Sequence, residues 1–167
     1  MEERLQGNPV SEGIAYAKSY IYIPGTLTKA PDFFPKGQEE EKYREFRESC
    51  EKADSELVTL YNGMCKEDPD KAKIFSAHRE LLQDEEILDE IRETICEENM
   101  NPDSAVSKVY TEFAELLAGV EDPLIAERAA DLRDVRDRLL RILSGQETSK
   151  LSSFSGDVIL VAHDLFT

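Results

Sequence analysis

Residues 75–86 read Phe-Ser-Ala-His-Arg-Glu-Leu-Leu-Gln-Asp-Glu-Glu, which predicts an amphipathic helix that ends in an acidic cluster. Phe75, His78, Leu81 and Leu82 recur at intervals of three and four residues, so they share one helical face. Residues 84–86 add three carboxylates where that face ends. Such a face is either buried core or a groove for a basic, partly apolar protein partner, and both interpretations fit the periodicity.

Four helices are predicted around this stretch. The first follows a connector that runs to about residue 38, and Gly63 lies near its end. Its apolar residues recur every three or four positions: Tyr43, Phe46, Cys50, Ala53, Leu57, Leu60 and Met64. Three later helices begin where a capping side chain precedes a proline, at Asp68, Asn101 and Asp122. They cover about 69–98, 102–118 and 123–144. The helix over 69–98 can bend near Asp84, where the acidic side chain would cap it again.

Two strands are predicted outside the helices. Residues 13–23 are rich in β-branched and aromatic side chains, and residues 158–162 form an unbroken apolar run. The short connections between the helices predict antiparallel neighbours. The sequence therefore predicts a mainly α fold, in which an antiparallel four-helix bundle is inserted between two short strands.

Composition narrows the classes of function. The 167 residues carry 20 Lys and Arg against 36 Asp and Glu, a net charge of −16 that would repel nucleic acid and anionic membranes. No secretory leader or membrane-spanning apolar run is visible. The three cysteines (Cys50, Cys65 and Cys96) are widely spaced, which predicts reduced thiols and a cytoplasmic location.

The residues predict no catalytic or metal site. The glycines do not form a phosphate-binding loop, and the two histidines, His78 and His163, belong to different elements with no further ligand at suitable spacing. Arg128, Arg133 and Arg138 alternate with acidic residues on the last helix, which is typical of an exposed face laced with salt bridges.

Four motifs in register resemble the N-terminal domain of Enzyme I, the phosphoenolpyruvate–protein phosphotransferase of the bacterial sugar phosphotransferase system. The first motif is the stretch at 75–86, and the second runs from Glu127 to Asp134 and on to Arg141. The other two are residues 11–15, which resemble the opening strand, and residues 158–165, which resemble the strand after the helices. The resemblance therefore extends over nearly the whole chain.

The resemblance implies that different segments of the chain belong to different subdomains. A helical subdomain, expected at residues 39–145, would dock the phosphocarrier protein HPr. Residues 1–25 and 146–167 would belong to an α/β subdomain that carries a phosphohistidine, and residues 26–38 would connect the two. In this family phosphoenolpyruvate binds to a C-terminal barrel with magnesium, and the whole protein is expected to be a homodimer through that missing domain.

The same resemblance places the phosphohistidine beyond this chain. In the family it follows the strand that ends in Ala-x-Asp-Leu, within a Gly-Gly-x-(Ser/Thr)-(Ser/Thr)-His segment. The chain stops at Thr167, before such a segment, and neither His78 nor His163 lies in one. We therefore expect an N-terminal fragment that docks HPr and transfers no phosphate itself, with no catalytic residue and no cofactor of its own.

The family's docking surface maps onto particular positions. Partner-binding residues are expected on the second to fourth predicted helices: His78, Leu81, Leu82, Asp84, Glu85, Glu86, Ile87, Leu117 and Arg128. Leu81, Ile87 and Leu117 would contact the apolar patch of HPr, and the acidic residues would attract its Arg and Lys rim. His78 would either bond the partner or pack in the core, while Arg128 would help to position the phosphohistidine or the carrier.

Some residues depart from the family pattern and leave alternatives open. Glu80 occupies a position that is commonly apolar, and Lys73 lies one turn before His78. Either residue could tune the site to another carrier, as in paralogues that serve nitrogen regulation or dihydroxyacetone phosphorylation. Outside the family, the helices could form an adaptor scaffold without phosphotransfer, or a small enzyme that uses its carboxylates. Unpaired strand edges could also mediate dimerisation.

Overall fold

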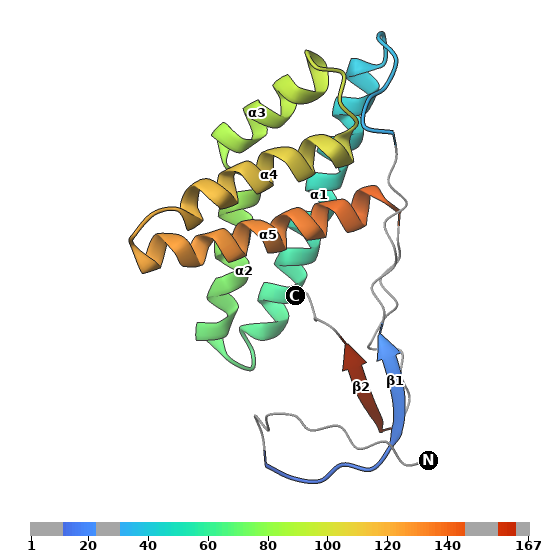
Figure 1. The fold of residues 1–167 in the computed structure, drawn as a ribbon. Coiled ribbons are helices and arrows are strands. Elements are labelled where there is room, and N and C mark those ends of the chain that lie inside the picture. The colour runs from blue at the N-terminus through green and yellow to red at the C-terminus, as the bar shows by residue number, and fades with distance from the viewer. Residues whose placement is uncertain (1–11, 23–30, 146–156, 163–167) are drawn as a thin grey trace. The chain divides into compact units, whose positions relative to one another are not determined.

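The computed structural model describes residues 12–22, 31–145 and 157–162. Across these residues the chain forms β1 (Lys18–Tyr22), α1 (Glu39–Met64), α2 (Pro69–Leu82), α3 (Glu85–Cys96), α4 (Pro102–Ala118), α5 (Pro123–Leu143) and β2 (Val158–Ala162) (Figure 1). The predicted mainly α fold, with helices inserted between two strands, is confirmed. Residues 11, 23–30, 146–156 and 163–165, on which other expectations fell, lie outside the described residues.

The helix predicted over 69–98 is two helices rather than one bent helix. Asp84 lies between them with extended backbone angles, φ −63° and ψ 120°, and its Oδ1 accepts hydrogen bonds from the backbone N–H groups of Glu86 and Ile87 at 3.0 and 3.2 Å. These bonds satisfy N–H groups that have no partner inside a helix. The bend expected at Asp84 is therefore a complete break, and the helical unit has five helices among the described residues.

The other predicted caps divide into two kinds. Asp68 accepts bonds from the backbone N–H groups of residues 70 and 71, and Asp122 from that of Leu124. Asn101 does not cap α4 with its side chain, contrary to the prediction. Its Nδ2 instead donates to the carbonyl of Pro31 at 2.6 Å, and its backbone N–H donates to the carbonyl of Asp32 at 2.9 Å. Asn101 thus anchors the segment that leads into α1.

The two strands pair in parallel, with Lys18 opposite Val158 and Tyr22 opposite Ala162. β1 is shorter than the strand predicted at 13–23, because its described partner β2 offers only five residues to pair with. The chain divides into two compact units, a strand unit that holds β1 and β2 and a helical unit that holds α1 to α5. The strands therefore flank the helical unit in sequence while pairing with each other.

The core of the helical unit is built from the inward stripes of all five helices. α5 packs against α4, α1 and α2, while α3 packs against α4 and α1 (Figure 1). The stripe of α5 is almost wholly buried and consists of Ala129, Leu132, Val135 and Leu139. The largest fully buried side chains from the other helices include Phe46, Leu57, Leu82, Ile91, Ile95, Val106, Val109 and Tyr110. Their burial removes apolar surface from water, which is the main stabilising contribution to such a fold.

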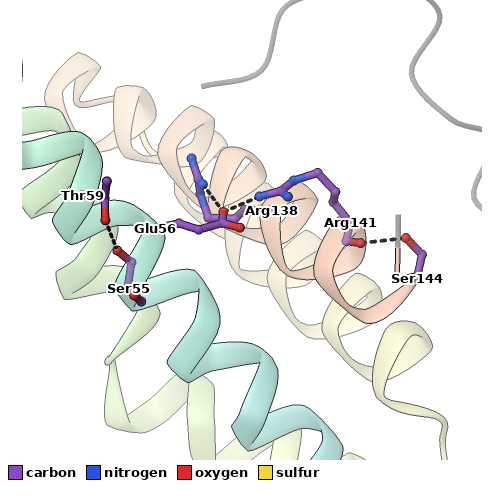
Figure 2. A network of polar contacts seen from close by, with 6 residues as sticks. All are labelled: Ser55, Glu56, Thr59, Arg138, Arg141 and Ser144. Atoms are coloured by element: carbon purple, nitrogen blue, oxygen red, sulfur yellow. Dashed lines mark hydrogen bonds and ion pairs between the residues drawn. The ribbon is translucent and has the colours of Figure 1, made fainter. Parts of the chain in front are cut away.

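A half-buried ion pair joins the C-terminal half of α5 to α1. Arg138 Nη1 donates to Glu56 Oε2 at 2.7 Å, and Arg141 Nη2 bonds the same oxygen (Figure 2). The Arg138 side chain is only 6% exposed, so it does not lie on an exposed salt-bridged face as expected. Its burial lowers the pKa of the guanidinium, and the bond to Glu56 opposes that effect. Glu56 therefore compensates a charge that the core would otherwise disfavour.

Replacing Glu56 with Ala should destabilise the helical unit, because Arg138 would keep its buried charge and lose this carboxylate partner. We expect the free energy of unfolding to fall by about 1–3 kcal/mol in urea denaturation, because Glu56 itself is partly exposed. Glu48→Ala, at an exposed position on the same helix, should change it by less than about 0.5 kcal/mol. Equal losses in the two variants would contradict the role assigned to Glu56.

Candidate protein-docking surface

The nine residues predicted to bind a partner differ widely in exposure. Four are exposed: Asp84, Glu85, Glu86 and Arg128. Leu81 and Leu117 are half-buried and pack against the core. His78, Leu82 and Ile87 are buried, each no more than 2% exposed. His78, Leu82 and Ile87, all expected among the partner-binding residues, therefore offer almost no surface for direct contact.

His78 lies in the interior between two helices. It is 1% exposed, and its Nε2 lies 3.4 Å from Oδ1 of Asp131 on α5. Since buried polar groups need a hydrogen-bond partner, this pair accounts for a histidine on an otherwise apolar face. The inward side of α2 is thus made by Phe75, His78 and Leu82, while Leu81 lies at its border. The structure favours packing over direct partner contact for His78.

Three exposed apolar residues lie close together in the sequence where α4 ends and α5 begins, and none of them is among the predicted partner-binding residues. Leu116 and Leu124 are 70% and 74% exposed, and Val120 between them is 38% exposed. The signal was present in the sequence. Counting back from Leu132 in helical steps reaches Ala129 and Ile125, which leaves Leu124 off the inward stripe. We call Leu116, Val120 and Leu124 the apolar corner.

The carboxylates near these helices are largely solvent-exposed. Asp84, Glu85 and Glu86 lie at the junction of α2 and α3, and we call them the acidic junction. Three further carboxylates are exposed on or beside the apolar corner: Glu115, Glu121 and Glu127. Lys73, which departs from the family pattern, forms an exposed ion pair with Asp70 at 2.7 Å. Such a pair contributes little to the free energy of unfolding. Glu80, the other departure, is exposed on α2. The surface is therefore apolar and acidic, which suits a partner of the opposite charge.

Arg128 lies one helical turn before Asp131, the partner of the buried His78. Leu124, Arg128 and Asp131 stand at positions i, i+4 and i+7 of α5, so they follow one side of that helix. Arg128 is exposed and makes no ion pair within the described part of the chain. α5, which carries Arg128, packs against both α2 and α4. These two helices carry Leu81 and Leu117, so all three predicted residues lie on neighbouring helices. The contacts do not place the acidic junction directly beside Arg128.

Within residues 12–22, 31–145 and 157–162, no three His, Cys, Asp or Glu side chains gather as metal ligands do. The magnesium that the resemblance implies is expected in the C-terminal barrel of the whole protein, not in these residues. Cys50, Cys65 and Cys96 are free thiols, and burial raises the pKa of Cys50 to about 12, which keeps its thiol protonated. None of the described helices is long and apolar enough to cross a bilayer.

Comparison with known proteins gives a consistent result. The family model described as PEP-utilising enzyme, N-terminal, matches residues 6–128. A phosphoenolpyruvate-protein phosphotransferase of Staphylococcus aureus (strain MRSA252) is 32% identical over 170 residues, and that of Priestia megaterium is 34% identical over 166 residues. Each alignment covers 99% of this chain and 29% of the relative. The chain thus spans less than a third of the length of these relatives.

Two solved structures share the fold. A solution structure of Enzyme I superposes with a TM-score of 0.80 at 31% identity, covering 89% of this chain and 60% of that one. The N-terminal domain of a nitrogen Enzyme 1 gives a TM-score of 0.69 at 23% identity, with the same coverage. The second likeness shows the fold alone.

The burial of His78 predicts that it matters for stability, whereas Leu124 should not. His78→Ala would leave a cavity and remove the partner of Asp131, so we expect the free energy of unfolding to fall by about 2–3 kcal/mol. Leu124→Ala should change it by less than about 0.5 kcal/mol, because the side chain is mostly in water. Urea denaturation of both variants tests this, and a stable His78→Ala protein would argue against the buried placement.

Two substitutions at Asp84 should separate its capping role from its charge. Asp84→Ala removes the acceptor for two backbone N–H groups and should lower the free energy of unfolding by about 1 kcal/mol. Asp84→Asn keeps a good capping side chain, so its loss should be only a few tenths of a kcal/mol. Chemical denaturation followed by far-ultraviolet circular dichroism measures both effects. Equal losses for the two variants would show that charge, rather than the cap, stabilises α3.

Proposed function

This chain belongs to the family of PEP-utilising enzyme N-terminal domains, and from that premise we propose that its helical unit docks the phosphocarrier protein HPr. The whole protein would be a phosphoenolpyruvate–protein phosphotransferase that passes phosphate from phosphoenolpyruvate through a histidine to HPr, for sugar uptake. In this proposal the described residues recognise the carrier. The phosphohistidine, the magnesium-dependent binding of phosphoenolpyruvate and the dimer contacts belong to other parts of the whole protein.

The observation that carries the proposal is the apolar corner in an acidic surrounding. Leu116 and Leu124 expose most of their side chains on a chain whose net charge is −16. An apolar patch with a polar rim is typical of a protein interface. The resemblance assigns HPr an apolar patch ringed by Arg and Lys, and this matches both features.

The individual residues would contribute in different ways. The apolar corner, with Leu117 and the exposed part of Leu81, would be buried against the carrier and supply most of the affinity. Asp84, Glu85 and Glu86 would act on the association rate and orientation, because exposed carboxylates attract a basic rim over distances that salt screens. Arg128 would orient the carrier within the acidic surface. His78, Leu82 and Ile87 would support this surface from beneath rather than touch the partner.

A titration of this chain with HPr from the same organism tests the proposal. Amide NMR at low and high salt should show shifts at residues 81, 84–86, 116–117, 124 and 128, with binding that weakens as salt rises. Leu124→Ala should weaken the affinity about tenfold, because exposed apolar residues at the centre of an interface dominate its energy. Leu60→Ala, at a 39% exposed leucine on α1, is the matched control and should stay within about twofold.

Other outcomes point to the alternatives. A folded protein with no shifts at millimolar HPr would leave the family fold without this partner, as expected of a helical adaptor. Binding to the carrier of nitrogen regulation or of dihydroxyacetone phosphorylation in place of HPr would assign the chain to one of those paralogues. Shifts confined to residues outside the apolar corner and the acidic junction would contradict the surface proposed here.

A further inference from the structure

The last turn of α2 is tied to two other helices by polar side chains. Arg79 donates through Nε and Nη2 to the two oxygens of Asp54 on α1, at 2.7 and 3.2 Å. Gln83 Nε2 donates to Oδ1 of the same Asp54 at 3.0 Å. On the other side of α2, His78 meets Asp131 of α5 at 3.4 Å. All these contacts fall within two turns of the break between α2 and α3.

The contacts at the break itself involve consecutive residues. Gln83 is the C-cap of α2 and is bonded to α1 through Asp54, while Asp84 is the N-cap of α3 and is bonded to the first turn of that helix. The direction in which α3 leaves α2 is therefore fixed from both sides of one peptide bond. Glu85 and Glu86, the exposed carboxylates assigned to carrier attraction, follow immediately.

We infer that Asp54 is a positioning residue for carrier docking, which it serves by holding the α2–α3 break and thereby the acidic junction in place. The inference rests on the proposed function, but Asp54 is outside the docking residues named there. A carboxylate that accepts two bonds from one guanidinium has a defined geometry, since the planar fork fixes both oxygens. A third bond, from Gln83, carries that geometry to the residue that ends α2.

We call the bonds from Arg79 and Gln83 to Asp54 the clamp. The clamp affects the position of the α2–α3 break more than the stability of the fold. Asp54 and Arg79 are 30% and 40% exposed, and ion pairs at such positions contribute little to the free energy of unfolding. Docking is more sensitive, because carboxylates that attract a basic rim must lie where that rim arrives. This separates Asp54 from Glu56, two residues later on α1, whose partner Arg138 is buried.

Three variants test the inference. Asp54→Ala and Arg79→Gln each break the clamp from one end, and Glu51→Ala removes one negative charge from an exposed position three residues earlier on α1. We expect both clamp variants to weaken HPr affinity about fivefold, with amide shifts at residues 84–87 in the absence of HPr and a nearly unchanged urea midpoint. Glu51→Ala should stay within about twofold in affinity and leave those amides in place.

The charge of Arg79 gives the sharpest discrimination. If Asp54 acted only by neutralising Arg79 near a basic carrier, then Arg79→Gln would tighten HPr binding while Asp54→Ala weakened it, and the positioning role would be overturned. Unchanged affinity in both variants, with normal binding by the wild type, would also overturn it and leave the proposed function standing. Failure of the wild type to bind HPr would instead refute the proposed function, and the amide shifts at 84–87 would still decide whether Asp54 holds the break.

Discussion

The helical unit depends on the burial of one stripe of α5, because that helix packs against three others at once. Ala129, Leu132, Val135 and Leu139 are each no more than 1% exposed, and they close the space between α4, α1 and α2. The polar contacts of α5 extend the same arrangement. Asp131 meets His78 at the side of α2, and Arg138 meets Glu56 at the side of α1. Because these contacts cover its inner side, α5 is exposed mainly in its first turns and on its outer face.

α1 and α5 hold α2 by different physical means. The contact with α5 is interior, so its histidine contributes to packing and must keep a polar partner. The polar contact with α1 is partly exposed, so this ion pair acts through geometry rather than through a large free energy. A surface that binds another protein benefits from this combination. The interior contact keeps the helix in place, and the outer one fixes how its end is presented.

Much of the fold could be predicted because the signals were local. Proline after Asp or Asn marked the starts of α2, α4 and α5, and the three-and-four spacing of apolar residues marked their inward sides. The errors concern partners far away in the sequence. Nothing near Asn101 indicates that its side chain bonds Pro31 rather than its own helix, and nothing near His78 indicates that Asp131 would cover it. The family resemblance indicated a region for a surface, which stays a prediction, but not the exposure of each residue, which tertiary packing decides.

The parallel pairing of β1 and β2 has a consequence for the order of folding. Parallel neighbours need a crossover connection, and here that connection contains the complete helical unit. Contacts between helices that follow one another, such as α1 with α2 and α4 with α5, span short stretches of chain and form quickly. The strands meet only after a long loop has closed, at an entropic cost that falls once the helices have folded and shortened the flexible part of that loop. The helical unit is thus expected to fold first, and the sheet to close afterwards.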